Sequence, residues 1–468
     1  MTSPLRYLST RGAQAPLPFQ DAVLCGLADD GGLLVPETLP DARPYLDDWK
    51  GLSYADLAFA VMRLFAPDFP AHRLRALLSD AYASFEGDDP APVRPLEGDL
   101  WLLELFHGPT LAFKDFALQV LGRLFAEILS ARGEKLNIVA ATSGDTGSAA
   151  ICGVRGQERV GIFVMHPHGR VSPLQERQMT SVLDGNVFNI ALEGSFDDCQ
   201  NLMKKLFGDL PFKREYRLGA VNSVNWARIA SQIVYYFYAA FRVMEETGKD
   251  EVQFAVPTGN FGDILAGWYA KRMGLPVRRL VLATNENDIL ARFFHTGRYV
   301  KGEVVRSLSP SMDIQVASNF ERWLFERLGR DPLATAAAFE TFAATGEYVL
   351  PGAVKGAIDR EIVAAACDRQ RTLATIAKHY RAQGILLDPH TAAGVFAAKQ
   401  YDTGSTPTIC LATAHPAKFP AAIREALGED VPEAHHPVLD ALADAPTRMA
   451  VLPNDCETVR AFVAEHAK

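Results

Sequence analysis

Short apolar runs alternate with stretches of helical periodicity along most of the chain after Trp101. Runs of strand length occur at 136–141, 160–165, 187–192, 254–256, 280–283 and 408–412. Helices are predicted over 148–154, 225–246, 264–273, 318–328, 332–345 and 369–383. Strands that alternate with helices in this way are typical of an α/β fold with a mostly parallel sheet.

Residues 1–95 follow a different pattern and are predicted to form a separate N-terminal accessory domain. This part has a short strand near 5–8, a helix at 21–27 and two more helices near 54–66 and 71–86. The acidic, proline-rich stretch 86–99 is interpreted as a linker or surface connection to the core, residues 96–468.

Composition narrows the classes of protein that fit. The chain has 468 residues, of which 48% are hydrophobic, enough to fill the cores of about three domains of typical size. Its net charge of -9 argues against a nucleic acid or an anionic membrane as the main partner. The six cysteines contain no CxxC pair, so we expect neither a metal site nor a disulfide framework. With no apolar core of a signal peptide and no apolar run of bilayer length, we expect a cytoplasmic protein.

One lysine stands out for its surroundings. In FHGPTLAFKDFALQ, 106–119, Gly108 and Pro109 predict a turn, Thr110 can cap, and apolar residues then recur at helical spacing, which places Lys114 in a first helical turn. A lysine desolvated among aromatic residues can form a Schiff base with a carbonyl or with pyridoxal phosphate. From this stretch alone, a solvated surface lysine is the more common interpretation.

Two predicted strand-to-helix turns are candidates for binding anions. SGDTG at 143–147 puts small residues at a helix start, where free N–H groups favour negative charge, although a tight turn capped by Asp145 explains it equally well. GNFGD at 259–263 has two glycines that let the backbone wrap around a phosphate, which we favour over a plain turn. It matches neither a Walker loop nor GxGxxG, so an ATP or NAD site is not indicated.

A third candidate precedes the longest predicted helix. In NSVNWAR, 222–228, Arg228 could hold a second phosphate with Asn222 and Ser223 beside it. Taken alone, this stretch is better explained as an N-cap followed by a surface arginine.

Together these motifs resemble a known family. The segments YLSTRG (7–12), GLADDGGLLVP (26–36), FHGPTLAFKD (106–115), PTGNFGD (257–263) and ATAHPAKF (412–419) are similar to the fold-type II pyridoxal-phosphate enzymes, the group of tryptophan synthase β. Within that group they most resemble the threonine synthase family in its long bacterial and fungal form. The resemblance implies that 96–468 forms two α/β subdomains with open, mostly parallel sheets, and that the cofactor lies in the cleft between them.

The resemblance also assigns residues. It implies that Lys114 carries pyridoxal phosphate as a Schiff base and shuttles protons, with Phe113 packed against the ring. The cofactor phosphate would be held by Gly259, Asn260, Phe261, Gly262 and Asp263, and the pyridine nitrogen would face Thr413. The substrate carboxylate and phosphate would be bound by Ser143, Gly144, Asp145, Thr146, Asn222, Ser223 and Arg228. His415 and Lys418 receive no role.

One position departs from many fold-type II relatives, which have Asn where this chain has Asp145. An ionised carboxylate cannot donate a hydrogen bond to the cofactor, so Asp145 would be protonated, turned away, or used as a helix cap.

The implied activity is a β,γ-replacement that converts O-phospho-L-homoserine and water to L-threonine and phosphate, in a monomer or homodimer. The alternatives are a related phospho-lyase or dehydratase that releases 2-oxobutyrate, and a metabolite sensor that has lost turnover. A complete set of phosphate turns beside an intact Lys114 argues against the sensor.

Overall fold

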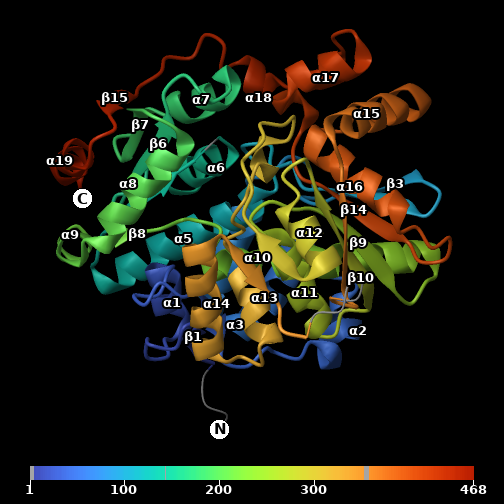
Figure 1. Ribbon diagram of the computed structural model, residues 1–468, viewed down its shortest axis with the longest axis horizontal. Coiled ribbons are helices and arrows are strands. Elements are labelled where there is room, and N and C mark those ends of the chain that lie inside the picture. Colours follow the sequence, from blue (N-terminus) through green and yellow to red (C-terminus); the bar gives the residue numbers. More distant parts are fainter. Residues whose placement is uncertain (1–4, 143, 353–357) are drawn as a thin grey trace.

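Two sheets dominate the computed structural model, which describes residues 5–142, 144–352 and 358–468 (Figure 1). The first sheet has five strands in the order β15-β7-β6-β5-β8, all parallel. They are β5 (Leu136–Ala141), β6 (Val160–Pro167), β7 (Val187–Glu193), β8 (Leu218–Gly219) and β15 (Ala450–Pro453). The prediction of α/β architecture with mostly parallel sheets is confirmed.

The second sheet has six strands in the order β13-β10-β9-β14-β4-β3. They are β3 (Val93–Glu97), β4 (Leu100–Glu104), β9 (Val252–Pro257), β10 (Val277–Thr284), β13 (Ile362–Ala366) and β14 (Thr408–Ala412). All neighbours are parallel except β3, which pairs antiparallel with β4. The interpretation of 86–99 as a linker was therefore wrong in part, because this stretch forms the edge strand β3, where Pro95 needs no hydrogen-bonding N–H.

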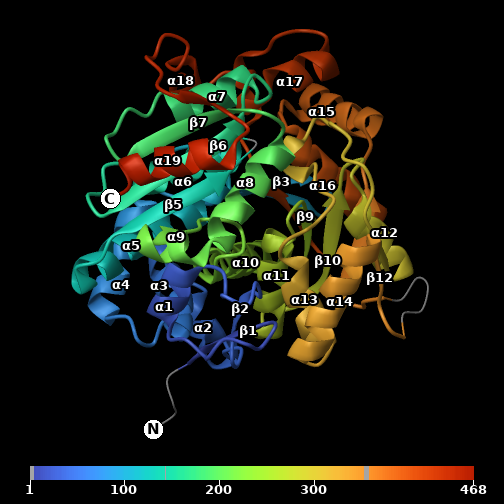
Figure 2. The same cartoon turned by 60° about the vertical axis from the view of Figure 1, so that its left-hand side comes forward.

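Helices cover both sheets (Figures 1 and 2). In the first half of the core they are α5 (Lys114–Arg132), α6 (Asp145–Val154), α7 (Pro173–Thr180), α8 (Phe196–Gly208), α9 (Leu210–Glu215), α10 (Trp226–Thr247), α11 (Gly262–Arg272) and α12 (Ile289–Thr296). They continue with α13 (Phe320–Arg327), α14 (Pro332–Thr345), α15 (Arg369–Gln383), α16 (Pro389–Gln400), α17 (Pro420–Leu427), α18 (Pro437–Asp440) and α19 (Cys456–His466). A small two-stranded antiparallel sheet pairs β11 (Arg298–Val300) with β12 (Glu347–Val349).

The N-terminal segment packs beneath the core, at the bottom of Figure 1. It contains β1 (Tyr7–Ser9), β2 (Leu34–Pro36), α1 (Phe19–Cys25), α2 (Leu46–Trp49), α3 (Tyr54–Phe65) and α4 (Ala71–Tyr82). The YLSTRG motif is structural, since the Thr10 hydroxyl donates to Glu321 of α13 at 2.6 Å and Arg11 pairs with the same carboxylate at 3.0 Å. These bonds connect the N-terminal segment to α13 through a nearly buried carboxylate.

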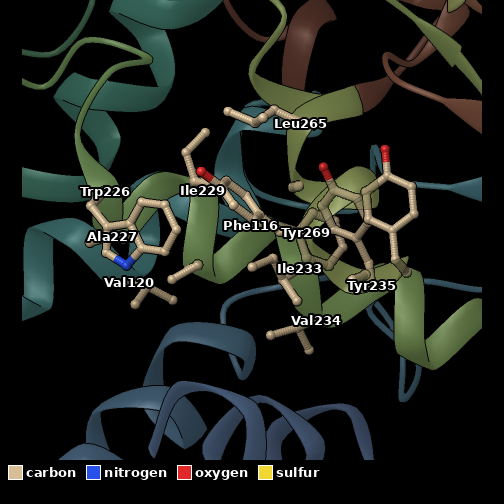
Figure 3. Packing of buried hydrophobic residues seen from close by; sticks show 14 of the residues in the cluster. Phe116, Val120, Trp226, Ala227, Ile229, Ile233, Val234, Tyr235, Leu265 and Tyr269 are labelled. Carbon is tan, nitrogen blue, oxygen red and sulfur yellow. The ribbon is translucent and has the colours of Figure 1, made fainter. Parts of the chain in front are cut away.

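Helix α10 runs through the centre of the largest apolar cluster. Nearly every side chain from Trp226 to Phe241 is buried, so the helix is fixed on most of its sides. Figure 3 shows part of this cluster, with Phe116 and Val120 of α5, Trp226, Ala227, Ile229, Ile233, Val234 and Tyr235 of α10, and Leu265 and Tyr269 of α11. Because α5, α10 and α11 pack together, their N-terminal ends are held in fixed positions.

No helix in the described part of the chain is long and apolar enough to cross a membrane.

Candidate active site

One cavity collects the ends of strands from both sheets. The segments that follow β4, β9 and β14 of the six-stranded sheet and β5 of the five-stranded sheet all contribute to its wall. It encloses about 690 Å³, including its open mouth. Of the predicted site residues, it is lined by Phe113, Lys114, Asp145, Thr146, Ser223, Arg228, Gly259, Asn260, Phe261, Gly262, Asp263 and Thr413. Ligands of α/β proteins bind at such carboxyl ends of strands.

Two predicted residues in the described part of the chain do not line this cavity. Gly144 lies directly before α6 but does not line the cavity. Asn222 points elsewhere, since its Nδ2 lies 3.8 Å from Sδ of Met203. Ser143 lies outside the described residues.

Helix α5 begins at Lys114 itself, with Phe113 in the N-cap position. The prediction that Thr110 caps this helix was wrong. The backbone N–H and hydroxyl of Thr110 instead donate to the Asp115 carboxylate, each at 2.8 Å. The turn before Lys114 is thus closed by a buried acid inside the helix, and this fixes where the lysine side chain starts.

The Lys114 amine is buried at the end of this turn. Its Nζ donates to Oγ of Ser311 at 3.0 Å and lies 3.5 Å from Oδ2 of Asp145. Burial lowers the pKa of Lys114, because the ammonium loses its hydration, while Asp145 acts in the opposite direction. A lowered pKa increases the fraction of neutral amine, which is the form that attacks a carbonyl.

Asp145 faces the lysine as a carboxylate. Its Oδ1 accepts from Nζ of Lys418 at 3.0 Å and from Nε2 of Gln175 at 3.1 Å, and its Oδ2 accepts from Oγ of Ser311 at 3.0 Å. Burial opposes ionisation, but the positive charges of Lys418 and Lys114 outweigh it and hold the pKa of Asp145 well below its usual range. Of the three possibilities for this departure, the contacts with two lysines argue against protonation, and the carboxylate makes no capping bond at the start of α6.

The glycine-rich turn connects β9 to α11. Phe261 adopts a left-handed conformation with φ 63°, and the helix begins at Gly262. The N–H groups of a first helical turn have no partner within the helix, so this end of α11 suits a phosphate.

We expect Gly259→Ala to lower the affinity of the protein for pyridoxal phosphate by about tenfold, or about 1.4 kcal/mol. A Cβ on Gly259 would lie 2.4 Å from the backbone oxygen of Ser311, so the chain beside Lys114 must move. Fluorescence titration of the cofactor-free protein measures the affinity. Gly208→Ala is the control, because a Cβ there meets no described atom within 4 Å. An unchanged affinity in Gly259→Ala would contradict the tight fit.

Asp263 turns its carboxyl group toward α10 rather than leaving it open to a bound anion. Its Oδ1 accepts from the hydroxyls of Tyr235 at 2.6 Å and Tyr236 at 2.9 Å, while Oδ2 has no partner among the described residues. Burial raises the pKa of Asp263 to about 7, and the two tyrosines reduce this rise. A carboxyl with this pKa is partly neutral at physiological pH, which lessens its repulsion of a phosphate.

The raised pKa of Asp263 predicts a pH dependence of stability. Between about pH 4, where the unfolded carboxyl loses its proton, and about pH 7, the folded protein binds more protons, so the free energy of unfolding falls as pH rises. Relative to Asp263→Asn, the wild type should lose on the order of 4 kcal/mol over this range. Urea unfolding of both cofactor-free proteins at several pH values measures the difference. A difference that stays constant with pH would argue against a neutral Asp263.

Arg228 and Ser223 approach the cavity from the start of α10. The Arg228 side chain is buried, its Nη1 donates to the backbone oxygen of Val221 at 3.0 Å, and its Nε has no partner among the described residues. Burial lowers the pKa of Arg228 to about 10, so the guanidinium is still charged at neutral pH. A buried cation with an unused N–H is suited to a ligand anion.

Thr413 directly follows β14 and lines another side of the cavity. Its backbone oxygen accepts from the N–H of Phe113 at 2.9 Å, and its own N–H donates to the hydroxyl of Thr391 at 3.2 Å. These bonds fix Thr413 relative to the residue before Lys114.

The wall also contains residues that the sequence did not predict, among them Ser311 and His390. The N–H of Ser311 donates to Nε2 of His390 at 3.3 Å, and Nδ1 of that ring lies 2.7 Å from Oδ1 of Asp388, which places the ring proton on Nδ1. Asp388 also caps α16. The Asp-Pro pair, typical of a helix start, is therefore the sequence signal that could have pointed to His390. Ser311 lies in the short 3-10 helix Pro310–Met312, whose sequence carries no pattern that could have revealed it.

The residues that converge here fit pyridoxal phosphate. Lys114, a buried lysine with a lowered pKa, can bind the cofactor's aldehyde. The turn before α11, where position 259 has space only for glycine, can bind the phosphate. Thr413 offers a neutral hydroxyl. Within the described residues, no three His, Cys, Asp or Glu side chains gather closely enough to hold a metal ion.

Comparison with known proteins agrees with this geometry. A model of pyridoxal-phosphate dependent enzymes matches residues 88–411, which makes this chain an enzyme of that class, of fold type II. Models of the threonine synthase N terminus and of the threonine synthase C-terminal region match residues 6–82 and 391–463. The chain belongs to the threonine synthase family.

Individual relatives extend along nearly all of the chain. It is 50% identical to the threonine synthase of Pseudomonas aeruginosa over 465 residues, covering 99% of this chain and 98% of that protein. The crystal structure of threonine synthase from Brucella melitensis with bound pyridoxal phosphate superimposes with a TM-score of 0.93 at 44% identity, covering 99% and 100% of the two chains. The yeast threonine synthase structure gives 0.91 at 40% identity, covering 98% of each. Pyridoxal phosphate is therefore the cofactor, and the substrate is a small molecule.

Proposed function

We propose that the chain converts O-phospho-L-homoserine and water to L-threonine and phosphate. The observation that carries the proposal is a single cavity with two places suited to phosphate, the turn 259–263 and the pair Ser223 and Arg228, on a wall that also holds Lys114. One place would serve the cofactor and the other a phosphorylated substrate. An enzyme whose amino acid substrate carries no phosphate would not need the second.

Pyridoxal phosphate, when bound, supplies an electron sink that stabilises negative charge on the α carbon of an amino acid. Its phosphate would be held by Gly259, Asn260, Phe261, Gly262 and Asp263, its ring would pack on Phe113, and Thr413 would face its nitrogen.

Lys114 moves the protons. Its amine, when released from the cofactor, has a pKa that burial holds below the usual range of lysine, which favours its role as the base that takes the substrate's α proton. Ser311 and Asp145 hold Nζ by the contacts described above, which keeps the amine in one place during the transfer. Loss of a β proton then accompanies departure of phosphate from the γ carbon. A proton delivered to the γ carbon, water added at the β carbon and a proton returned to the α carbon complete L-threonine, and the remaining proton leaves with the phosphate.

Arg228 and Ser223 would hold the substrate phosphate and stabilise it as it leaves. The N-terminal end of α6, with Asp145 and Thr146 in the wall, would bind the amino acid part of the substrate, together with Ser143 and Gly144. Asn222 does not line the cavity and would act only indirectly, through its neighbour Ser223. Threonine formation draws on metabolites of the cytoplasm, and we place the activity there, in a monomer or homodimer.

The choice of substrate tests the proposal. The cofactor-loaded protein is incubated separately with O-phospho-L-homoserine and with L-threonine, and phosphate and 2-oxobutyrate are measured. We expect phosphate from the first compound and no 2-oxobutyrate from the second. Rapid formation of 2-oxobutyrate from L-threonine would instead identify a dehydratase on the same fold.

A further inference from the structure

Lys418 is a buried cation close to the cavity, in the short 3-10 helix Pro416–Lys418 that follows β14. Its Nζ has two contacts, the backbone oxygen of Thr110 at 2.7 Å and Oδ1 of Asp145 at 3.0 Å. Lys418 thus connects three segments that surround the cofactor site: the end of β14, the start of α6 and the turn before Lys114.

The carboxylate of Asp145 lies between two lysines. Lys418 contacts Oδ1, whereas Lys114 and the Ser311 hydroxyl contact Oδ2. The side chains of Asp145 and Lys418 are only 3% and 0% exposed, so water cannot replace either partner of the pair. When the cofactor occupies the Lys114 amine, Lys418 is the cation that still touches the carboxylate.

We propose that Lys418 is a positioning residue, which keeps Asp145 ionised and turned toward Lys114 through the catalytic cycle. Asp145 then accepts a hydrogen bond from the released Lys114 amine at each turnover. Through its bond with Ser311, it also keeps the amine in the same orientation. A neutral Asp145 would lose one acceptor site and would let Nζ take other positions. The pairing also accounts for a carboxylate where many fold-type II enzymes have an amide.

The charged and titratable groups around the pair come from four elements. Lys114 of α5, Lys418 of the 3-10 helix Pro416–Lys418 and His390 of α16 face Asp145, and Arg228 of α10 acts on Lys114. Asp115 is a second buried carboxyl near Lys418, and burial raises its pKa to about 6, with Thr110 and Lys418 limiting the rise. Any test must therefore separate Asp145 from Asp115.

Four variants make this separation: Lys418→Met, Lys418→Arg, Asp145→Asn and the double variant Asp145→Asn/Lys418→Met. The absorbance of the bound cofactor is titrated between pH 5.5 and 9 in each. We expect Lys418→Met to gain a titration step that is absent from the wild type, from Lys418→Arg and from the double variant. A Lys418→Met curve like the wild type would overturn the proposal, as would a step that persists in the double variant, since that step would belong to Asp115.

A second readout needs no bound cofactor. Lys114 in the cofactor-free proteins is labelled with an amine-reactive anhydride at several pH values and quantified by mass spectrometry. In Lys418→Met the midpoint should rise by about one pH unit, a tenfold loss of free amine at fixed pH, because Lys114 becomes the main cation facing Asp145. In the double variant it should fall back to the wild-type value or below it. An unchanged midpoint in Lys418→Met would contradict the proposal.

Folding is the remaining control. If Lys418→Met fails to fold but the double variant folds, the uncompensated charge of Asp145 is the cause, as proposed. If both fail alike, Lys418 serves the Thr110 carbonyl instead, and the proposal is wrong. The inference deepens the proposed function because it concerns the same lysine, but its readouts use no substrate, so an error in the substrate assignment would leave them unchanged.

Discussion

Replacing Lys114 with alanine should lower turnover by about 10³-fold or more and abolish the covalent attachment of the cofactor. Lys114 supplies the only amine that we place at the reacting atoms. A water molecule in the same position between Ser311 and Asp145 would be a much weaker base than the amine. Turnover is measured as phosphate release. Attachment is measured by borohydride reduction, denaturation and mass spectrometry.

Lys135→Ala is the matched control. Lys135 is an exposed lysine just beyond the end of α5, so its loss removes the same charge from the same region without touching the cavity. Covalently bound cofactor in Lys114→Ala, or normal turnover, would show that another amine carries the chemistry.

Arg228→Gln should raise the KM for O-phospho-L-homoserine by about 100-fold, equivalent to about 2.7 kcal/mol. The substitution keeps a polar side chain, but it removes a buried charge with an unused N–H and the bond to the backbone oxygen of Val221. Steady-state kinetics over a wide substrate range measures KM and kcat separately.

Arg242→Gln controls for the loss of an arginine from the same helix. Arg242 lies near the other end of α10, where it stacks over Tyr238 outside the cavity wall. If Arg228→Gln instead lowered the affinity for pyridoxal phosphate and left the KM unchanged, Arg228 would belong to the cofactor's phosphate site.

The sequence predicted the parts of the fold whose periodicity is strong. The expected helices 332–345 and 369–383 coincide with α14 and α15, and strand 408–412 coincides with β14. Helix α16 was missed because it is buried on nearly all sides, so PHTAAGVFAAKQ shows no amphipathic period. Strand β3 was missed because proline and acidic residues at a sheet edge resemble a loop.

The candidate site was predictable where a motif lies at the end of a strand. Lys114, the turn 259–263 and Thr413 come together because the carboxyl ends of parallel strands meet at one edge. Ser311 lies in the short 3-10 helix Pro310–Met312, and its place beside Lys114 depends on bonds to residues distant in sequence, such as His390. The role of Lys418 could not be inferred from sequence, since its contact with Asp145 joins positions far apart in the chain.

The product balance tests the central claim most directly. The cofactor-loaded protein is incubated with O-phospho-L-homoserine, and phosphate, L-threonine and 2-oxobutyrate are quantified in the same samples over time. The proposed function predicts equal amounts of phosphate and L-threonine with no 2-oxobutyrate. Phosphate accompanied by 2-oxobutyrate, or no phosphate at all, would contradict it.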